Sequence, residues 1–289
     1  MGKYVIMTDS SCDLSEEYIK EHGLDVLNLL YNMDGTIYGE DKTMDIKEFY
    51  AKMRGGSMPT TMAVNPEDVA NAMRRHLEQG EDILYIAFSS GLSASCQNAV
   101  LGANDVQDEF PDRKIIVVDS LCASMGQGLF VHYALKRQAE GMSLEENVRW
   151  LEEHKLNICH QFTVDDLHHL HRGGRVSKAT AILGTMINVK PVLHVDDEGK
   201  LISLYNVRGR KKSLQALVSN MEKTIGGFEN ENDDIFISHG DCMDDVLYLE
   251  KLIEEKFGKK NFYVNYVGAV IGAHSGPGTM ALFYLGNKR

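Results

Sequence analysis

Three short apolar runs in the first half of the chain each end in a loop of hydroxyl or carboxylate side chains. This pattern restricts the fold more than any other feature. The runs are residues 4–8, 83–88 and 115–118, with helical patterns between them. Alternation of buried strands with amphipathic helices indicates a parallel sheet with helices on its faces. We therefore predict an α/β fold whose N-terminal part is a mostly parallel, Rossmann-like sheet.

The helices of this half have recognisable starts. Asn65 precedes Pro66, and apolar residues follow at helical spacing. An Asn cap followed by proline in the first turn is typical of a helix N-terminus. Ser143 and Glu146 have the spacing of a capping box, which predicts a second helix start.

The pattern changes after about residue 156, where apolar runs pair as a hairpin and then alternate with helices. The predicted strands are residues 191–195, 201–207, 235–238 and 262–267. The first two are joined by a short DDEG turn, which favours antiparallel pairing. We therefore predict two α/β domains, residues 1–157 and 158–289, the second with a mixed sheet and helices.

Charge and composition exclude several classes of protein. The 289 residues carry 30 Lys and Arg against 42 Asp and Glu, a net charge of −12. Binding to nucleic acid needs a surplus of basic side chains, so we predict no nucleic-acid partner. With 43% apolar and 25% charged residues the chain is not disordered. No apolar run approaches the roughly 18 residues of a membrane span, which predicts no stable membrane insertion.

The cysteines and the N-terminus indicate a reducing compartment. The five cysteines are odd in number and widely spaced, so neither a disulfide framework nor a zinc site is predicted. The first apolar run is shorter than the roughly 7–15 residues of a secretory core. We predict a cytoplasmic protein without a metal or other cofactor.

The loops after the predicted parallel strands are rich in hydroxyls, and ligands bind at that edge of such sheets. They read TDSS at 8–11, SSGLS at 89–93 and DS at 119–120. Ser93 precedes a predicted helix, whose free N–H groups favour an anion. Helix capping explains this serine equally well. A nucleophilic role is a third reading, although the GLSAS segment lacks the second glycine of a nucleophile elbow.

Other polar segments are ambiguous when each is considered alone. The pair Thr60 and Thr61 is also ordinary turn chemistry. Asp165, His168 and His169 have metal-ligand spacing, but a solvated helix face is the preferred interpretation.

Basic and glycine-rich segments of the second half give more information. Two basic segments suggest an anionic ligand or partner. One is GGRVSK at 173–178, before a predicted helix over 179–187, and the other is the cluster of basic residues that begins at Arg208. A glycine-dense loop, predicted for residues 268–279, carries His274, the best acid–base or hydrogen-bonding candidate in the chain.

Taken together, five motifs resemble the DegV family of bacterial fatty-acid-binding proteins. In chain order they are TDSSCDL at 8–14, PTT at 59–61, SSGLS at 89–93, GGRVSK at 173–178 and GAHSGPG at 272–278. The resemblance runs from Tyr4 to about Leu285. It implies two α/β domains that hold a long-chain fatty acid such as palmitate, stearate or oleate. It also implies no catalytic activity of the chain itself, and a kinase partner that phosphorylates the bound carboxylate to an acyl phosphate.

The resemblance also assigns roles to residues. Thr61 and Ser93 match positions that hydrogen-bond the carboxylate. Arg175 and His274 match a polar network behind the head group, and Arg208 matches a position tied to phosphorylation with the kinase. The same motifs place four neighbours of these residues in the ligand site, namely Thr60, Ser90, Gly91 and Ser275.

Two departures from the family pattern border the expected head-group site. Met62-Ala63-Val64 stands where the family has Ser-Gln-Pro, and Ala94-Ser95-Cys96 stands where it has Gly-Thr-Tyr. The alternative function is a serine esterase or lipid hydrolase that uses Ser93 and His274. A small-molecule phosphotransferase is disfavoured because no G-x-x-x-x-G-K-[ST] loop or nucleotide-binding fingerprint occurs.

Overall fold

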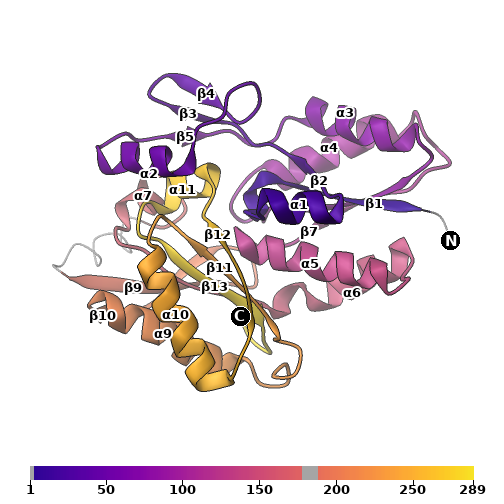
Figure 1. The fold of residues 1–289 in the computed structure, drawn as a ribbon. Helices are drawn as coiled ribbons and strands as arrows, with labels where there is room; N and C mark the ends of the chain where they lie inside the picture. The colour runs from indigo at the N-terminus through magenta and orange to yellow at the C-terminus, as the bar shows by residue number, and fades with distance from the viewer. Residues whose placement is uncertain (1–2, 178–187) are drawn as a thin grey trace.

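The computed structural model describes residues 3–177 and 188–289, which form two layered α/β units and a small third sheet (Figure 1). The first unit contains a four-stranded parallel sheet in the order β2-β1-β6-β7. Its strands are β1 (Tyr4–Asp9), β2 (Asp25–Leu27), β6 (Asp82–Ala87) and β7 (Ile115–Asp119). The predicted parallel sheet is confirmed, and β2 is an additional edge strand.

Helices cover both faces of this sheet because its strands are apolar on both sides. Ile83 and Tyr85 of β6 pack with α3 and α4, whereas Leu84 and Ile86 point toward α5. Alternate side chains of a strand face opposite sides, so a continuous apolar run needs cover on each. The helices are α1 (Glu16–His22), α3 (Pro66–Leu77), α4 (Ser95–Gln107), α5 (Met125–Ala139) and α6 (Leu144–His154).

The predicted helix starts are confirmed. The Asn65 side chain accepts a hydrogen bond from the Glu67 N–H at 3.0 Å, with Pro66 in the first turn of α3. Ser143 and Glu146 form both hydrogen bonds of a capping box at the start of α6. Such caps satisfy N–H groups that have no partner within the helix.

The second unit contains a mixed six-stranded sheet in the order β10-β9-β8-β13-β11-β12. Only β11 and β12 run parallel; the other neighbours are antiparallel, including the predicted hairpin of β9 and β10. The elements are β8 (Ile158–Thr163), β9 (Val189–Val195), β10 (Leu201–Arg208), α9 (Arg210–Thr224), β11 (Asp234–His239), α10 (Met243–Phe257), β12 (Asn261–Tyr266) and β13 (Met280–Leu285). The mixed sheet is as predicted, although β8 and β13 were not foreseen.

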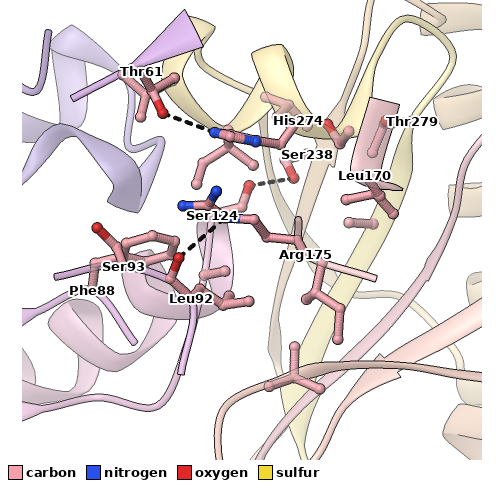
Figure 2. Close-up of a pocket in the computed structure, with 18 of the residues that line it drawn as sticks. Thr61, Phe88, Leu92, Ser93, Ser124, Leu170, Arg175, Ser238, His274 and Thr279 are labelled. Atoms are coloured by element: carbon pink, nitrogen blue, oxygen red, sulfur yellow. Dashed lines mark hydrogen bonds between the residues drawn. The ribbon is translucent and has the colours of Figure 1, made fainter. Parts of the chain in front are cut away.

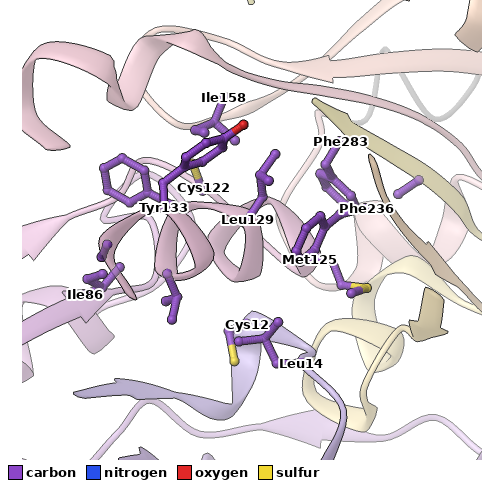
Figure 3. Packing of buried hydrophobic residues seen from close by; sticks show 14 of the residues in the cluster. Cys12, Leu14, Ile86, Cys122, Met125, Leu129, Tyr133, Ile158, Phe236 and Phe283 are labelled. Atoms are coloured by element: carbon purple, nitrogen blue, oxygen red, sulfur yellow. The ribbon is translucent and has the colours of Figure 1, made fainter. Parts of the chain in front are cut away.

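Helix α5 lies between the two sheets and joins their cores (Figure 3). Leu129 and Phe130 of α5 belong to one buried cluster with Ile86 of the first sheet and with Phe236 and Phe283 of the second. Helices α9 and α10 cover the far face of the second sheet. The chain passes from α6 to β8 through residues 155–157, and division into domains at 157 and 158 stays a prediction.

A small antiparallel sheet, in the order β4-β3-β5, lies beside helix α11. Its strands are β3 (Tyr31–Met33), β4 (Thr36–Tyr38) and β5 (Thr60–Thr61), with α2 (Ile46–Arg54), α7 (His168–Arg172) and α11 (Ala269–Ser275) nearby. The glycine-dense loop predicted for 268–279 was wrong in part, because residues 269–275 form α11. Gly272 allows α11 to approach Tyr50, so packing outweighs the low helix propensity of glycine.

Candidate functional site

A cavity of about 290 Å³ lies where the two units meet. Such a volume is close to the lower end of the range for small-molecule sites, roughly 300–1,000 Å³. Sixteen lining residues are apolar and come from both halves of the chain. They are Leu29, Met62, Ala63, Phe88, Leu92, Ala94, Ala123, Phe162, Leu170, Val195, Leu201, Val267, Val270, Ile271, Ala281 and Phe283.

Polar side chains line the same cavity among the apolar ones (Figure 2). They are Thr61, Ser93, Ser124, His160, Arg175, Ser238, His274, Ser275 and Thr279. Arg175 is the one permanently charged side chain among the described residues that line the cavity. A mostly apolar cavity with a few convergent polar groups suits a ligand with a long hydrocarbon portion and a small polar end.

Thr61 and His274 meet at one end of the cavity. Strand β5 carries Thr61 and pairs with β3 through Tyr31, while His274 lies in the last turn of α11. The Thr61 Oγ1 and His274 Nε2 atoms are 2.8 Å apart. Two of the predicted site residues, Thr61 and His274, are therefore brought together by two elements that are distant in the sequence.

The His274 ring is uncharged at neutral pH. Burial, together with the positive charges of Arg175 and Arg172, lowers the pKa of His274 to about 4. Its Nδ1 atom is buried without a hydrogen-bond partner among the described residues. An unpaired nitrogen costs less as a bare acceptor than as an N–H donor, so Nε2 is the better place for the proton. In that tautomer His274 donates to Thr61, whose hydroxyl hydrogen is free to point at a ligand.

Glycine at position 173 makes room for this ring. A Cβ atom there would lie 2.0 Å from His274 Nδ1, closer than any non-bonded contact. The predicted GGR segment thus has a packing role as well as a role in placing Arg175.

Arg175 reaches the cavity from the segment that follows α7. Its Nε donates to the Leu92 carbonyl oxygen at 3.1 Å, and its Nη1 donates to the Gly173 carbonyl oxygen. Figure 2 shows the guanidinium directed toward the space between Ser93 and His274. Burial lowers the pKa of Arg175, yet an arginine stays charged at any physiological pH. The cavity therefore has a fixed positive charge near its hydroxyl groups.

Ser93 lies just ahead of α4, as its position in the sequence predicted. Its Oγ accepts a hydrogen bond from the Ser95 N–H at 3.1 Å and lies 3.0 Å from the Ser95 Oγ. No hydrogen bond joins Ser93 to His274 within the described parts of the chain. A general base must come within about 2.6–3.2 Å of the proton that it removes, and His274 is instead paired with Thr61.

Four predicted site residues lie outside the cavity lining. Thr60 is exposed, because it points away from its neighbour Thr61 along β5. Ser90 is exposed, and its N–H donates to Asp119 Oδ1 at 3.2 Å. Gly91 packs against the turn of the β9–β10 hairpin, where a Cβ would lie 2.5 Å from the Glu198 oxygen. Arg208 is exposed at the end of β10.

Three further features concern the segment after Ser177, metal binding and membrane crossing. Lys178 and the helix predicted over 179–187 lie outside the described residues. Over residues 3–177 and 188–289, no group of His, Cys, Asp and Glu side chains could hold a metal ion. Within the same ranges, every helix is too short or too polar to cross a bilayer.

Several lining residues were not recognised from the sequence. Ser124 is the N-cap residue of α5, has a φ of 53° and donates to Asp13 Oδ2. Ser238 follows the apolar residues 235–237 on β11. His160, on the unforeseen strand β8, accepts from the Ala123 N–H at 3.2 Å and has its pKa well below the ordinary value because of burial. Lone serines and histidines in apolar runs are usually core residues, so only their common cavity identifies them.

Comparison with known proteins places the chain among close relatives. A family model described as "Uncharacterised protein, DegV family" matches residues 3–287. A DegV domain-containing protein of Clostridium perfringens is 41% identical over 292 residues, covering 100% of this chain and 99% of the relative.

Solved structures share the fold over nearly the whole length. A DegV family protein from Thermus thermophilus, described by its fatty acid binding, has a TM-score of 0.86 and 32% identity, with 98% and 99% of the two chains covered. A stearic acid-binding protein from Eubacterium ventriosum has a TM-score of 0.88 and 25% identity, with 98% of both chains covered.

Proposed function

Since this chain belongs to the DegV family, we propose that it binds one long-chain fatty acid, such as palmitate, stearate or oleate. The hydrocarbon tail occupies the cavity, and the hydroxyls of Thr61 and Ser93 hold the carboxylate. The observation that carries this proposal is the polarity of the cavity lining: among the described residues, sixteen apolar side chains line it together with hydroxyls and one arginine. The fatty acids of the structural relatives support it.

Burial of the tail supplies most of the affinity. A sixteen-carbon acid has about 14 methylenes, each contributing roughly 0.8 kcal/mol on burial, or about 11 kcal/mol in total. Association costs roughly 4–15 kcal/mol in lost freedom of motion. Apolar side chains such as Phe88, Phe162 and Phe283 line the cavity and would remove the surface of the tail from water. The carboxylate therefore contributes mainly orientation.

The head-group end suits an anion that must remain reactive. Thr61 and Ser93 supply neutral donors, and Arg175 supplies a positive charge whose Nε and Nη1 are already bonded to backbone oxygens. His274 is neutral, because its pKa is about 4, so it does not transfer a proton to the carboxylate. A carboxylate held in this way keeps a lone pair for attack on a phosphoryl donor.

The second part of the proposal is presentation of the bound acid to a partner kinase, which forms the acyl phosphate. The chain is then a non-enzymatic acyl carrier in the cytoplasm. Met62 and Ala94 line the cavity and are exposed, so the head-group end is open to the surface. Arg208 is exposed on β10, as a residue that contacts another protein must be.

The first experiment identifies the ligand. Protein purified gently from bacteria is extracted with organic solvent, and the extract is analysed by mass spectrometry, with uptake of added palmitate and oleate measured in parallel. We expect about one fatty acid per chain. An empty extract together with no uptake of either acid would contradict the proposal.

The second experiment separates carrier from enzyme. A fluorophosphonate probe labels an activated serine, so a carrier should remain unlabelled while it binds fatty acid. Labelling of Ser93 that disappears in Ser93→Ala would establish the hydrolase instead. Presentation is tested with a bacterial fatty acid kinase: Arg208→Ala should retain fatty acid but slow acyl-phosphate formation. Equal rates for the two proteins would remove Arg208 from that role.

A further inference from the structure

A second group of hydroxyls lines the cavity from the second unit, and Figure 2 shows two of them, Ser238 and Thr279, on the side away from Ser93. Ser238 is the penultimate residue of β11, Ser275 ends α11, and Thr279 precedes β13. Backbone hydrogen bonds hold these segments together, from Gly278 N–H to the Gly240 oxygen at 2.7 Å and from Gly240 N–H to the Thr279 oxygen at 2.8 Å. The segments that carry these three hydroxyls are therefore neighbours in the second unit.

Two hydroxyls in or near this group already donate their protons to protein acceptors. Thr279 Oγ1 donates to the Gly276 oxygen at 2.8 Å, and Ser124 Oγ donates to Asp13 Oδ2. Ser124 Oγ also lies 2.8 Å from Ser238 Oγ. When Asp13 is ionised, Ser124 donates to it, and Ser238 is then the donor to Ser124. The Ser238 oxygen then keeps a free lone pair as an acceptor.

Ser275 is different, because its hydroxyl has no hydrogen-bond partner among the described residues. The residue is 5% exposed and lines the cavity, and its Oγ makes no hydrogen bond to any described residue. A buried hydroxyl that has lost water without gaining a partner is costly. A plain alkyl chain cannot provide that partner, since it has neither a donor nor an acceptor.

We propose that Ser275 and Ser238 form a subsite for a hydroxyl group on the acyl chain, so that the protein prefers a hydroxylated long-chain fatty acid. This inference rests on the proposed fatty-acid function. A ligand hydroxyl accepts from Ser275 and donates to Ser238, which pairs both groups at once. A chain that carries only hydrogen at that position leaves Ser275 unpaired.

The test compares stearate with a series of hydroxystearates that differ only in the carbon bearing the hydroxyl. Dissociation constants are measured by calorimetry for the wild type, Ser275→Ala and Ser238→Ala. For at least one isomer we expect the wild type to bind as tightly as stearate or tighter. In each variant the same isomer should lose about tenfold in affinity relative to stearate, because its buried hydroxyl then loses one of its two hydrogen-bond partners.

Thr163→Val is the matched control. Thr163 also has a buried Oγ1 that bonds to none of residues 3–177 and 188–289, but it does not line the cavity. This variant should therefore leave the ratio of the two dissociation constants unchanged. If every hydroxystearate binds the wild type at least tenfold more weakly than stearate, the subsite is refuted.

The remaining outcomes are also decisive. If Ser275→Ala weakens stearate and hydroxystearate equally, Ser275 contacts the carboxylate and the inference is wrong. Failure of stearate itself to bind the wild type would instead refute the underlying fatty-acid function, so the two failures are distinguishable.

Discussion

Thr61 Oγ1 and His274 Nε2 lie 2.8 Å apart although 213 positions separate the two residues in the chain. The contact joins the small β4-β3-β5 sheet to helix α11 at one end of the cavity, where we propose that the carboxylate binds. It holds the Thr61 oxygen in place and leaves the threonine proton free, because a neutral histidine donates from Nε2. The predictions below test this arrangement and its surroundings.

Ser93→Ala should keep the fold and weaken fatty-acid retention by about tenfold or more. The variant removes one hydrogen bond to a charged group, which contributes about 1.5–3 kcal/mol. Retention is measured as the dissociation rate of a fluorescent fatty acid. Ser90→Ala is the control, since Ser90 is exposed and outside the cavity lining. Equal rates for both variants would remove Ser93 from the head-group role.

Gly173→Ala should weaken both stability and fatty-acid retention. The new methyl group would lie 2.0 Å from His274 Nδ1. The ring must therefore move away, which breaks its hydrogen bond with Thr61. Gly174→Ala is the matched control: Gly174 has a φ of 75° and open space around it. That variant should cost about 1–2 kcal/mol through backbone strain but retain ligand normally. Retention that is unchanged in Gly173→Ala would show that the His274 position is not critical.

The wild type should lose stability relative to His274→Gln as the pH falls from about 6.5 to about 4. Folding lowers the pKa of His274 to about 4, so over this interval the unfolded chain binds a proton that the folded chain does not. The expected difference is about 3 kcal/mol, at about 1.4 kcal/mol per pKa unit. Urea denaturation at pH 7 and at pH 4 measures it. Parallel pH profiles for the two proteins would contradict a buried neutral ring.

Asp13→Asn tests a buried carboxyl group that is hydrogen-bonded to Ser124, a residue of the cavity lining. Burial raises the pKa of Asp13 to about 7, although Gly268 N–H and Ser124 donate to it. The folded state therefore holds a proton that the unfolded state releases near pH 4, and this stabilisation is lost as the pH rises toward 7. Between pH 4 and pH 8 the wild type should lose as much as about 4 kcal/mol relative to the variant.

The comparison for Asp13 uses the same denaturation measurement at both pH values. Asp112→Asn, at an exposed position, should follow the wild type. If Asp13→Asn follows it as well, the carboxyl group is ionised in the folded state throughout this range.

Much of the first sheet could be predicted because its signals are local. Residues 4–8 and 83–88 are apolar on both faces, and the cap at Asn65 is formed by neighbours in the chain. Helix α11 could not be predicted in the same way, since seven residues with an internal glycine have little helical stability of their own. Its packing against Tyr50 and its neighbours provides that stability.

The sequence by itself determined the alternation of strands and helices, the hydroxyl-rich loops after the parallel strands, and the motifs that carry Thr61, Ser93, Arg175 and His274. These depend on spacing, capping and composition, which act between near neighbours. Only the tertiary structure decided that Thr61 faces the cavity and Thr60 does not, that Ser275 has an unpaired hydroxyl, and that residues of both halves enclose one space. Such relationships arise from the packing of two sheets about helix α5, and no local pattern encodes which distant side chains will meet across it.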